Sequence, residues 1–124
     1  MFAVLTGDIV DSTGLSVGEL EATLKAIGAA SDAIGAWPGV SVVGFARRGG
    51  DAWQMAFDAP VFALRAALYV NACIRRLDKA RASRMAMATG AGQMPGQDPN
   101  AAHGAAFTAS GRLLDSLPSG RHLD

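Results

Sequence analysis

The sequence has a single cysteine, Cys73, so no disulfide can form within the chain. This excludes the disulfide-stapled scaffolds of small secreted proteins and favours a reducing compartment, the cytoplasm. Long apolar runs are also missing, because none approaches the ~20 residues that a membrane-spanning helix needs. No basic segment followed by an apolar segment marks a signal peptide at the start. We therefore expect a soluble, cytoplasmic protein with no membrane partner.

A charge excess of either sign is missing as well. Lys and Arg together number 11, as do Asp and Glu, so the formal net charge is zero. No overall field then draws the chain to nucleic acid or to an anionic membrane. The basic residues between Arg75 and Arg84 are typical of charges at the C-terminal end of a helix, and nucleic acid is not expected as a partner. The 124 residues suffice for one hydrophobic core, and we expect a single domain over residues 1–124.

The sequence does contain a regular succession of strand and helix patterns. Period-two alternation predicts strands, and apolar residues at helical spacing predict helices. Strands are expected over residues 1–8, 40–47, 52–57 and 84–90, and helices over 16–37, 62–82 and 105–117, the last stopped by Pro118. The second and third strands are joined by RRGGD as a tight hairpin. The order βαββαβ predicts an α+β, ferredoxin-like core with an antiparallel sheet in the order 4-1-3-2, plus a C-terminal helix.

Two acids are expected at one end of this sheet. Asp8 closes the first strand and Asp51 opens the third, and these strands are antiparallel neighbours in that order. Neither acid has a cation placed beside it by helical spacing, and two unpaired carboxylates repel each other. A hard divalent cation removes this conflict, and Mg²⁺ or Mn²⁺ typically binds one or two carboxylates together with phosphate oxygens. The alternative is that both acids are ordinary turn or capping residues.

The segment after Asp8 fits a phosphate group beside such an ion. It consists of Val10, Asp11, Ser12 and Thr13. Its backbone N–H groups lead into a helix N-terminus and can cradle phosphate without added positive charge. Within this segment, Asp11 is best explained as a capping acid or as an acid behind the ligands. The sequence therefore predicts a phosphate-facing turn beside the two acids.

Four short motifs occur in an order and spacing that resemble the class III nucleotidyl cyclases: GDIVDST, RRGGDAWQMAF, RMAMATGAG and HGAAFTASGRLLD. The chain is most similar to the SatD family of that fold, and the likeness extends over about residues 2–117. The resemblance implies a phosphoryl-transfer chemistry, a nucleoside triphosphate as ligand and Mg²⁺ or Mn²⁺ as cofactor. It also implies a homodimer, because cyclase-like sites form between two protomers.

The resemblance also assigns roles to individual residues. Asp8 and Asp51 fall on the metal-binding aspartates, and Ile9 falls on the residue whose backbone carbonyl faces the ion. Arg112 falls on the arginine that neutralises the transferring phosphate, a role that suits a planar and permanently charged group. Thr108 falls where the cyclases place the asparagine that holds the ribose.

The parts that recognise the base differ from the cyclase pattern. Arg47 stands where adenine-specific cyclases have lysine, and Ala101 stands where a base-reading acid is expected. Gln54 repeats a glutamine of the SatD hairpin and is a candidate ligand contact. A pocket without hydrogen-bonding groups selects a purine only weakly. Two alternatives follow: a divergent metal-dependent nucleotide-binding enzyme, or a regulatory or dimerisation module that has lost the chemistry. The chain is either a minimal version of the fold or lacks C-terminal sequence.

Overall fold

The chain adopts an α+β fold, for which the computed structural model describes residues 1–117. Its strands and α-helices are β1 (Phe2–Ile9), α1 (Val17–Gly35), β2 (Val43–Arg48), β3 (Ala52–Phe57), α2 (Ala63–Arg75), β4 (Ser83–Gly90) and α3 (Ala105–Ser116). The strands form one antiparallel sheet in the order β2-β3-β1-β4. This is the order 4-1-3-2 viewed from the other side, so the predicted ferredoxin-like core with a C-terminal helix is confirmed.

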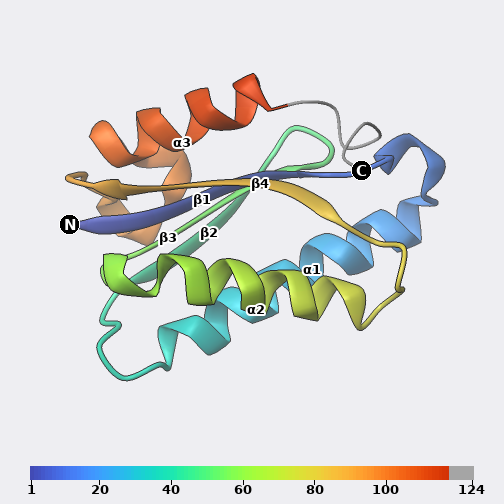
Figure 1. The fold of residues 1–124 in the computed structure, drawn as a ribbon, viewed down its shortest axis with the longest axis horizontal. Coiled ribbons are helices and arrows are strands. Elements are labelled where there is room, and N and C mark those ends of the chain that lie inside the picture. Colours follow the sequence, from blue (N-terminus) through green and yellow to red (C-terminus); the bar gives the residue numbers. More distant parts are fainter. Residues whose placement is uncertain (118–124) are drawn as a thin grey trace.

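Helices cover both faces of the sheet (Figure 1). In that view α1 and α2 lie below the sheet and α3 lies above it. The larger core fills the space between the sheet and the α1–α2 pair, where Leu5, Trp53 and Phe57 are fully buried. The smaller core lies under α3 and contains Val4 and Phe107. Burial on both faces explains why both alternating sets of side chains are apolar near the start of β1.

The second helix is shorter than its pattern predicted. α2 ends at Arg75, whereas helical spacing predicted residues 62–82. The Asp78 carboxylate accepts a hydrogen bond from the Ala80 N–H at 2.8 Å, and the Asp78 carbonyl accepts one from the Arg81 N–H at 3.0 Å. Aspartate commonly offers the backbone such a local alternative to the helix. α3 ends at Ser116 close to its predicted end, and Pro118 lies outside the described residues.

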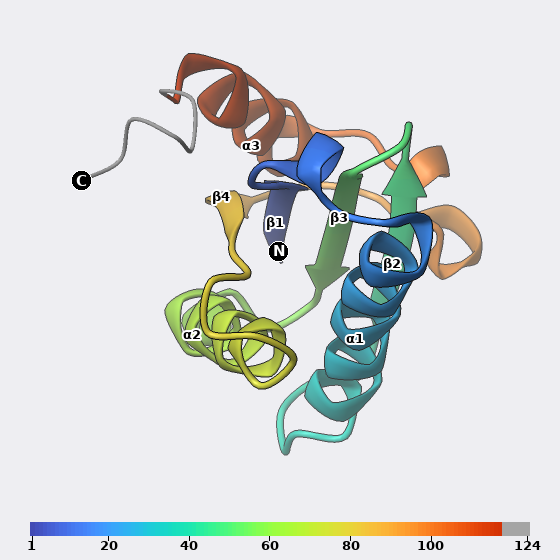
Figure 2. The same ribbon diagram turned by 90° about the vertical axis from the view of Figure 1, so that its right-hand side faces the viewer.

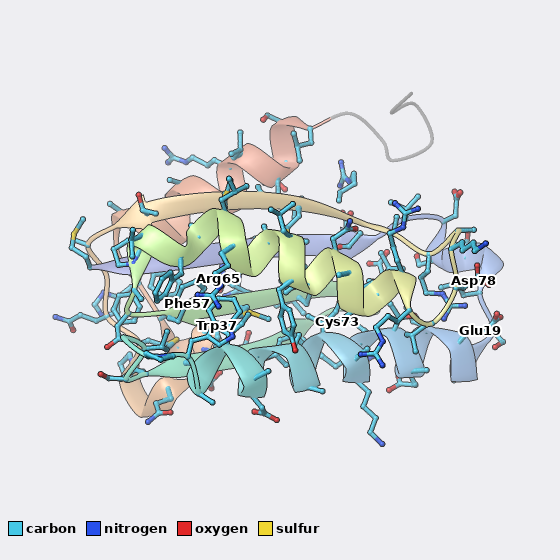
Figure 3. All side chains as sticks on the ribbon, turned by 60° about the horizontal axis from the view of Figure 1, so that its bottom comes forward. Glu19, Trp37, Phe57, Arg65, Cys73 and Asp78 are labelled. Atoms are coloured by element: carbon cyan, nitrogen blue, oxygen red, sulfur yellow. The ribbon has the colours of Figure 1, made fainter. Side chains whose placement is uncertain are left out.

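The α1–α2 pair is closed at one end by a cluster of aromatic side chains (Figure 3). Trp37 packs edge-on against Phe62 and Tyr69, with ring centroids 5.9 and 5.7 Å apart. The Arg65 guanidinium lies over the Trp37 ring, 4.2 Å from its centroid. Such a contact combines cation–π attraction with burial of the arginine stem. The cluster therefore fixes the C-terminal end of α1 against the start of α2.

β2 begins later than predicted because Asp58 binds the segment before it. The Asp58 carboxylate accepts hydrogen bonds from the backbone N–H groups of Ser41 at 2.9 Å and Val42 at 3.0 Å. Burial raises the pKa of Asp58, but the N–H groups of Val42 and Ser41 lower it more, and the pKa lies below its usual value of 3.8. The ionised carboxylate therefore stabilises the folded state.

Replacing Asp58 by alanine is expected to lower the free energy of unfolding by about 1–2 kcal/mol at pH 7, since two hydrogen bonds to a charged group are lost. Because the folded pKa is depressed, this contribution is present above the unfolded pKa and is lost as the pH falls through the folded value. Urea unfolding at pH 7 and at successively lower pH below about 4 would measure the difference. Asp32→Ala, at an exposed position of α1, is the control. A difference of equal size at all pH values would contradict this prediction.

Candidate functional site

The end of the sheet where β1 finishes and β3 begins brings the two predicted acids together. Asp8 lies opposite Ala52 in the β1–β3 register, and the Ile9 N–H donates to the Asp51 carbonyl at 3.1 Å. Asp8 and Asp51 are therefore one position apart across neighbouring strands, at the right-hand end of the sheet in Figure 1. The backbone arrangement confirms the predicted convergence of these two positions.

Each of the two carboxylates has its own partner. Arg84 lies opposite Asp8 in the β1–β4 register and donates from Nε to Asp8 Oδ1 at 2.8 Å and from Nη2 to Asp8 Oδ2. Such a two-pronged pair is the strong form of a charge-assisted hydrogen bond. Asp51 Oδ2 accepts a hydrogen bond from Ser12 Oγ at 2.7 Å. The expectation of two unpaired carboxylates is wrong for Asp8, because a cation reaches it from the next strand rather than along a helix.

Arg84 lies within the field of three carboxylates. Its hydrogen bonds with Asp8 raise the pKa of the guanidinium, burial lowers it, and the charges of Asp8, Asp115 and Asp51 raise it further. Arg84 Nη1 also donates to the Leu117 carbonyl at 3.0 Å. The Arg84 side chain is 18% exposed and that of Asp8 24%. The charges of three carboxylates thus act on one guanidinium at this end of the sheet, and carboxylates favour nearby cations.

The turn after β1 differs from the predicted phosphate cradle. The Val10 N–H donates to the Ala82 carbonyl at 2.9 Å, so this donor is used between β1 and the segment before β4. Asp11 has a left-handed φ of 52°, and Ser12–Gly14 follows as one turn of 3-10 helix. The prediction that the Val10 N–H faces a phosphate is therefore wrong. The later part of the turn, including the exposed Thr13, stays a candidate.

The N-terminus of α1 is closed by its own residues. Ser16 Oγ accepts a hydrogen bond from the Glu19 N–H at 3.0 Å, and Glu19 Oε1 accepts one from the Ser16 N–H at 2.9 Å. The bonds with Ser16 hold the pKa of Glu19 below its usual value. This capping box uses helix donors and places a carboxylate beside them. The turn therefore leads into a helix N-terminus that Ser16 and Glu19 already cap.

Gln54 is buried in a polar network inside the molecule. Its amide oxygen accepts a hydrogen bond from Arg48 Nη2 at 2.6 Å, and its Nε2 donates to Thr6 Oγ1 at 3.1 Å. Thr6 Oγ1 is in turn 2.8 Å from Ser110 Oγ of α3. Since Gln54 is 1% exposed, its side chain joins the sheet to α3 and does not present the expected ligand contact.

Arg47 is held against α1 rather than turned toward the acids. Its Nη1 donates to Glu21 Oε2 at 2.7 Å. Both residues line a groove of about 760 Å³ between α1 and β2, whose lining includes neither Asp8 nor Asp51. The structure thus separates Arg47 from the two acids with which the resemblance groups it.

Thr108 and Arg112 lie one turn apart on the exposed side of α3. The opposite side of the helix packs on the sheet through Ala106, Ser110 and Leu114. Within residues 1–117, neither Thr108 nor Arg112 has a side-chain hydrogen bond or ion pair with Asp8 or Asp51. The structure does not bring these two residues into the acidic end of their own chain.

The donor groups at the acidic end suit an ion that is shared with a ligand. Among the described residues, no group of three or more His, Cys, Asp or Glu side chains is placed to hold a metal ion. Two carboxylates and the Ser12 hydroxyl are present, and Mg²⁺ commonly uses one or two carboxylates with phosphate oxygens and water completing its shell. Because both Asp8 oxygens bind Arg84, an ion at Asp8 would either share these oxygens with the guanidinium or displace it.

Comparison with known proteins yields limited similarity. No protein-family model matches the chain, and no curated protein sequence matches it either. The chain resembles a solved structure described as a "Putative Chlorite dismutase", with a TM-score of 0.42 and 12% sequence identity. The match covers 71% of this chain and 44% of that protein. Separately, none of the helices in the described part is long and apolar enough to cross a membrane.

Proposed function

We propose that the domain binds the phosphate groups of a nucleoside triphosphate through Mg²⁺ or Mn²⁺ at the end of the sheet formed by Asp8 and Asp51. The observation that carries the proposal is the placement of Asp8 and Asp51 at one end of the sheet, where their charges and that of Asp115 all act on Arg84. A divalent cation would compensate negative charge there, and phosphate oxygens would complete its coordination. The cyclase and SatD resemblance agrees with this assignment and suggests phosphoryl transfer as the reaction class.

Each residue at this end of the sheet has its own role in the proposal. Asp8 and Asp51 hold the ion, with the Ile9 carbonyl beside them, and Ser12 orients Asp51 through its 2.7 Å hydrogen bond. The bound ion would neutralise phosphate charge. If Asp8 held the ion, the Arg84 guanidinium beside it could bind the phosphates, which its planar fork suits. Arg84 is thus a second candidate, beside Arg112, for the residue that neutralises phosphate charge.

A homodimer belongs to the proposal. Thr108 and Arg112 are the nucleotide-binding residues implied by the resemblance, yet neither bonds to Asp8 or Asp51 within the described part of its own chain. A second copy would have to contribute these side chains to the site. This stays a prediction for both residues.

Asp51→Asn is the sharpest test, because it keeps the shape of the side chain and removes a charge. In the parent protein, nucleoside triphosphate with Mn²⁺ at 100-fold above its dissociation constant is expected to stabilise the fold by about 2.7 kcal/mol. Asp51→Asn is expected to weaken binding at least about tenfold, or ~1.4 kcal/mol, with little change in stability without ligand. Thermal shift and calorimetry with and without Mn²⁺ would measure both.

The matched control is Asp32→Asn, which removes an acid from the groove beside α1 and should bind as the parent does. Unchanged binding by Asp51→Asn would contradict the proposal. So would loss of binding in Asp32→Asn alone, which would place the ligand in the groove.

The second candidate function is a non-catalytic regulatory or dimerisation module. The observation that favours it is the two-pronged Asp8–Arg84 pair, because the chain itself supplies the positive charge. The replacement residues Thr108 and Ala101 agree with it. In this case a panel of nucleoside triphosphates at millimolar Mg²⁺ or Mn²⁺ gives no thermal shift in the parent protein.

A further inference from the structure

The two edge strands of the sheet, β2 and β4, differ in how much of the chain packs against them. On the β2 side, the segment 94–101 packs closely: a Cβ atom on Gly44 would lie 2.4 Å from the Gln97 carbonyl oxygen, and Arg48 donates to the Pro99 carbonyl at 3.1 Å. On the other side, β4 has β1 as its single strand neighbour. Figure 2 shows β4 at the outside of the sheet, between α3 and α2, with no described segment along its outer edge. Figure 1 looks onto this same edge.

The hydrogen bonds of β1 show which backbone groups of β4 face outward. The Ile9 N–H donates to the Asp51 carbonyl beside β3, and the Val10 N–H donates to the Ala82 carbonyl beside β4. Backbone groups of successive strand residues point to alternate sides, so even-numbered residues of β1 and their even-numbered partners in β4 bond to each other. The outward N–H and C=O groups of β4 therefore belong to Ser83, Met85, Met87 and Thr89.

β4 lacks the features that protect an open edge from pairing. Natural sheets use lysine, proline, bulges or short strands for this purpose. β4 extends over 8 residues without proline or lysine, and its register with β1 is continuous. Its charged residue, Arg84, is bound to Asp8. Apolar side chains are exposed on β4 and its flanking helices: Leu64 (59%), Leu68 (62%), Met87 (40%) and Leu113 (45%).

We propose that this edge pairs antiparallel with β4 of a second copy of the chain, about a two-fold axis at Met87. In this register Met87 lies opposite Met87 of the second copy and Met85 lies opposite Thr89, so the outward donors of these three residues meet outward acceptors. The charges on β4 are also compatible with a second copy of the chain as the partner. Arg84 lies opposite Gly90 of the second copy, and the two Arg84 residues are six strand positions apart, ~20 Å, which is beyond the screening length.

The paired edges would form one continuous sheet across both copies. The exposed leucines belong to α2 and α3, the two helices that contact β4, and would add apolar contact between the copies where they reach the junction. Such an interface combines backbone hydrogen bonds with apolar burial, which is the mode of strand addition. The inference extends the homodimer of the proposed function, but it does not depend on nucleotide binding, so failure of one test leaves the other intact.

Met87→Lys tests the pairing, because it places two ammonium groups opposite each other at the two-fold axis. Sedimentation over a range of concentrations is expected to show a dimer for the parent chain and a dissociation constant raised at least about tenfold, or ~1.4 kcal/mol, for the variant. Val17→Lys, at a position that is 81% exposed at the start of α1, is the matched control and should dimerise as the parent does.

Hydrogen exchange of the parent chain provides a second measurement that needs no variant. The amides of Met85, Met87 and Thr89 should gain protection as the concentration rises, while the amides of other exposed segments should not. A parent chain that is monomeric at all concentrations would overturn the proposal. A dimer that Met87→Lys leaves intact, with these three amides unprotected, would overturn it equally.

Discussion

A single methyl group at position 7 is expected to reduce the free energy of unfolding by about 3 kcal/mol, at the upper end of what overpacking costs. Gly7 lies in the central strand β1, and a Cβ atom there would come within 2.5 Å of Trp53 Cζ2 and 2.6 Å of the Arg84 carbonyl oxygen. Trp53 is fully buried, and its Nε1 donates to Ser83 Oγ at 3.0 Å, so the ring has no free space to enter. The Arg84 carbonyl belongs to the backbone of β4 and cannot move independently.

Urea unfolding of Gly7→Ala beside Gly111→Ala would measure this effect. Gly111 is inside α3 and a Cβ atom there meets nothing within 4 Å, so alanine should raise the unfolding free energy by about 0.5–1 kcal/mol through helix propensity. The same chemical change is thus expected to have opposite signs at the two positions. Equal stability of both variants would show that Trp53 and β4 accommodate the methyl group.

The close contact at Gly7 also concerns the GDI motif, residues 7–9. Gly7 directly precedes Asp8 in this motif, and the structure places it against Trp53. Its requirement is steric and concerns the packing of the sheet on α2. The motif therefore combines a packing residue with an acid that pairs with Arg84.

Local patterns predicted the fold well because each depends on which face of an element is buried. β3 was predicted over residues 52–57 and is found at Ala52–Phe57. Alternation placed Gln54 on the face opposite Trp53, and the structure confirms it: Trp53 lies in the larger core, whereas Gln54 bonds to Thr6 on the α3 side. The helix predicted over residues 62–82 was too long. The apolar residues continue at helical spacing, but the chain forms a turn at Asp78 instead of a further helical turn.

The candidate site was harder to predict because its contacts join distant residues. Asp8 and Arg84 are 76 positions apart, and their pairing depends on the β1–β4 register. A shift of one residue would turn Arg84 to the other face of the sheet, and the sequence pattern alone does not determine that register. The predicted strand order did place the start of the fourth strand beside the end of the first. Because Arg84 is the charged residue at that start, its position was the feature of the sequence that could have predicted its pairing with Asp8.

The Asp8–Arg84 pair is expected to be strongly coupled in a double-mutant cycle. Arg84→Met removes the guanidinium and leaves a largely buried carboxylate without its partner, which should cost about 2–4 kcal/mol. Asp8→Asn leaves the guanidinium without its charge partner and should also destabilise. The double variant should lose less than the sum of both, with an interaction energy of about 1–3 kcal/mol. If the two single effects simply add, the interaction between Asp8 and Arg84 contributes little to the free energy of unfolding.

The same variants distinguish the two candidate functions, because Arg84 and a divalent cation compete for the same carboxylate oxygens. If Asp8 holds an ion, Mn²⁺ should bind Arg84→Met more tightly than the parent chain and restore part of its lost stability, as a ligand selective for the folded state does. Asp51→Asn combined with Arg84→Met should abolish that rescue. If Mn²⁺ changes the stability of none of these variants, with or without nucleoside triphosphate, Arg84 is a permanent replacement for the ion. The acidic end of the sheet is then a structural ion pair in a module without phosphoryl-transfer chemistry.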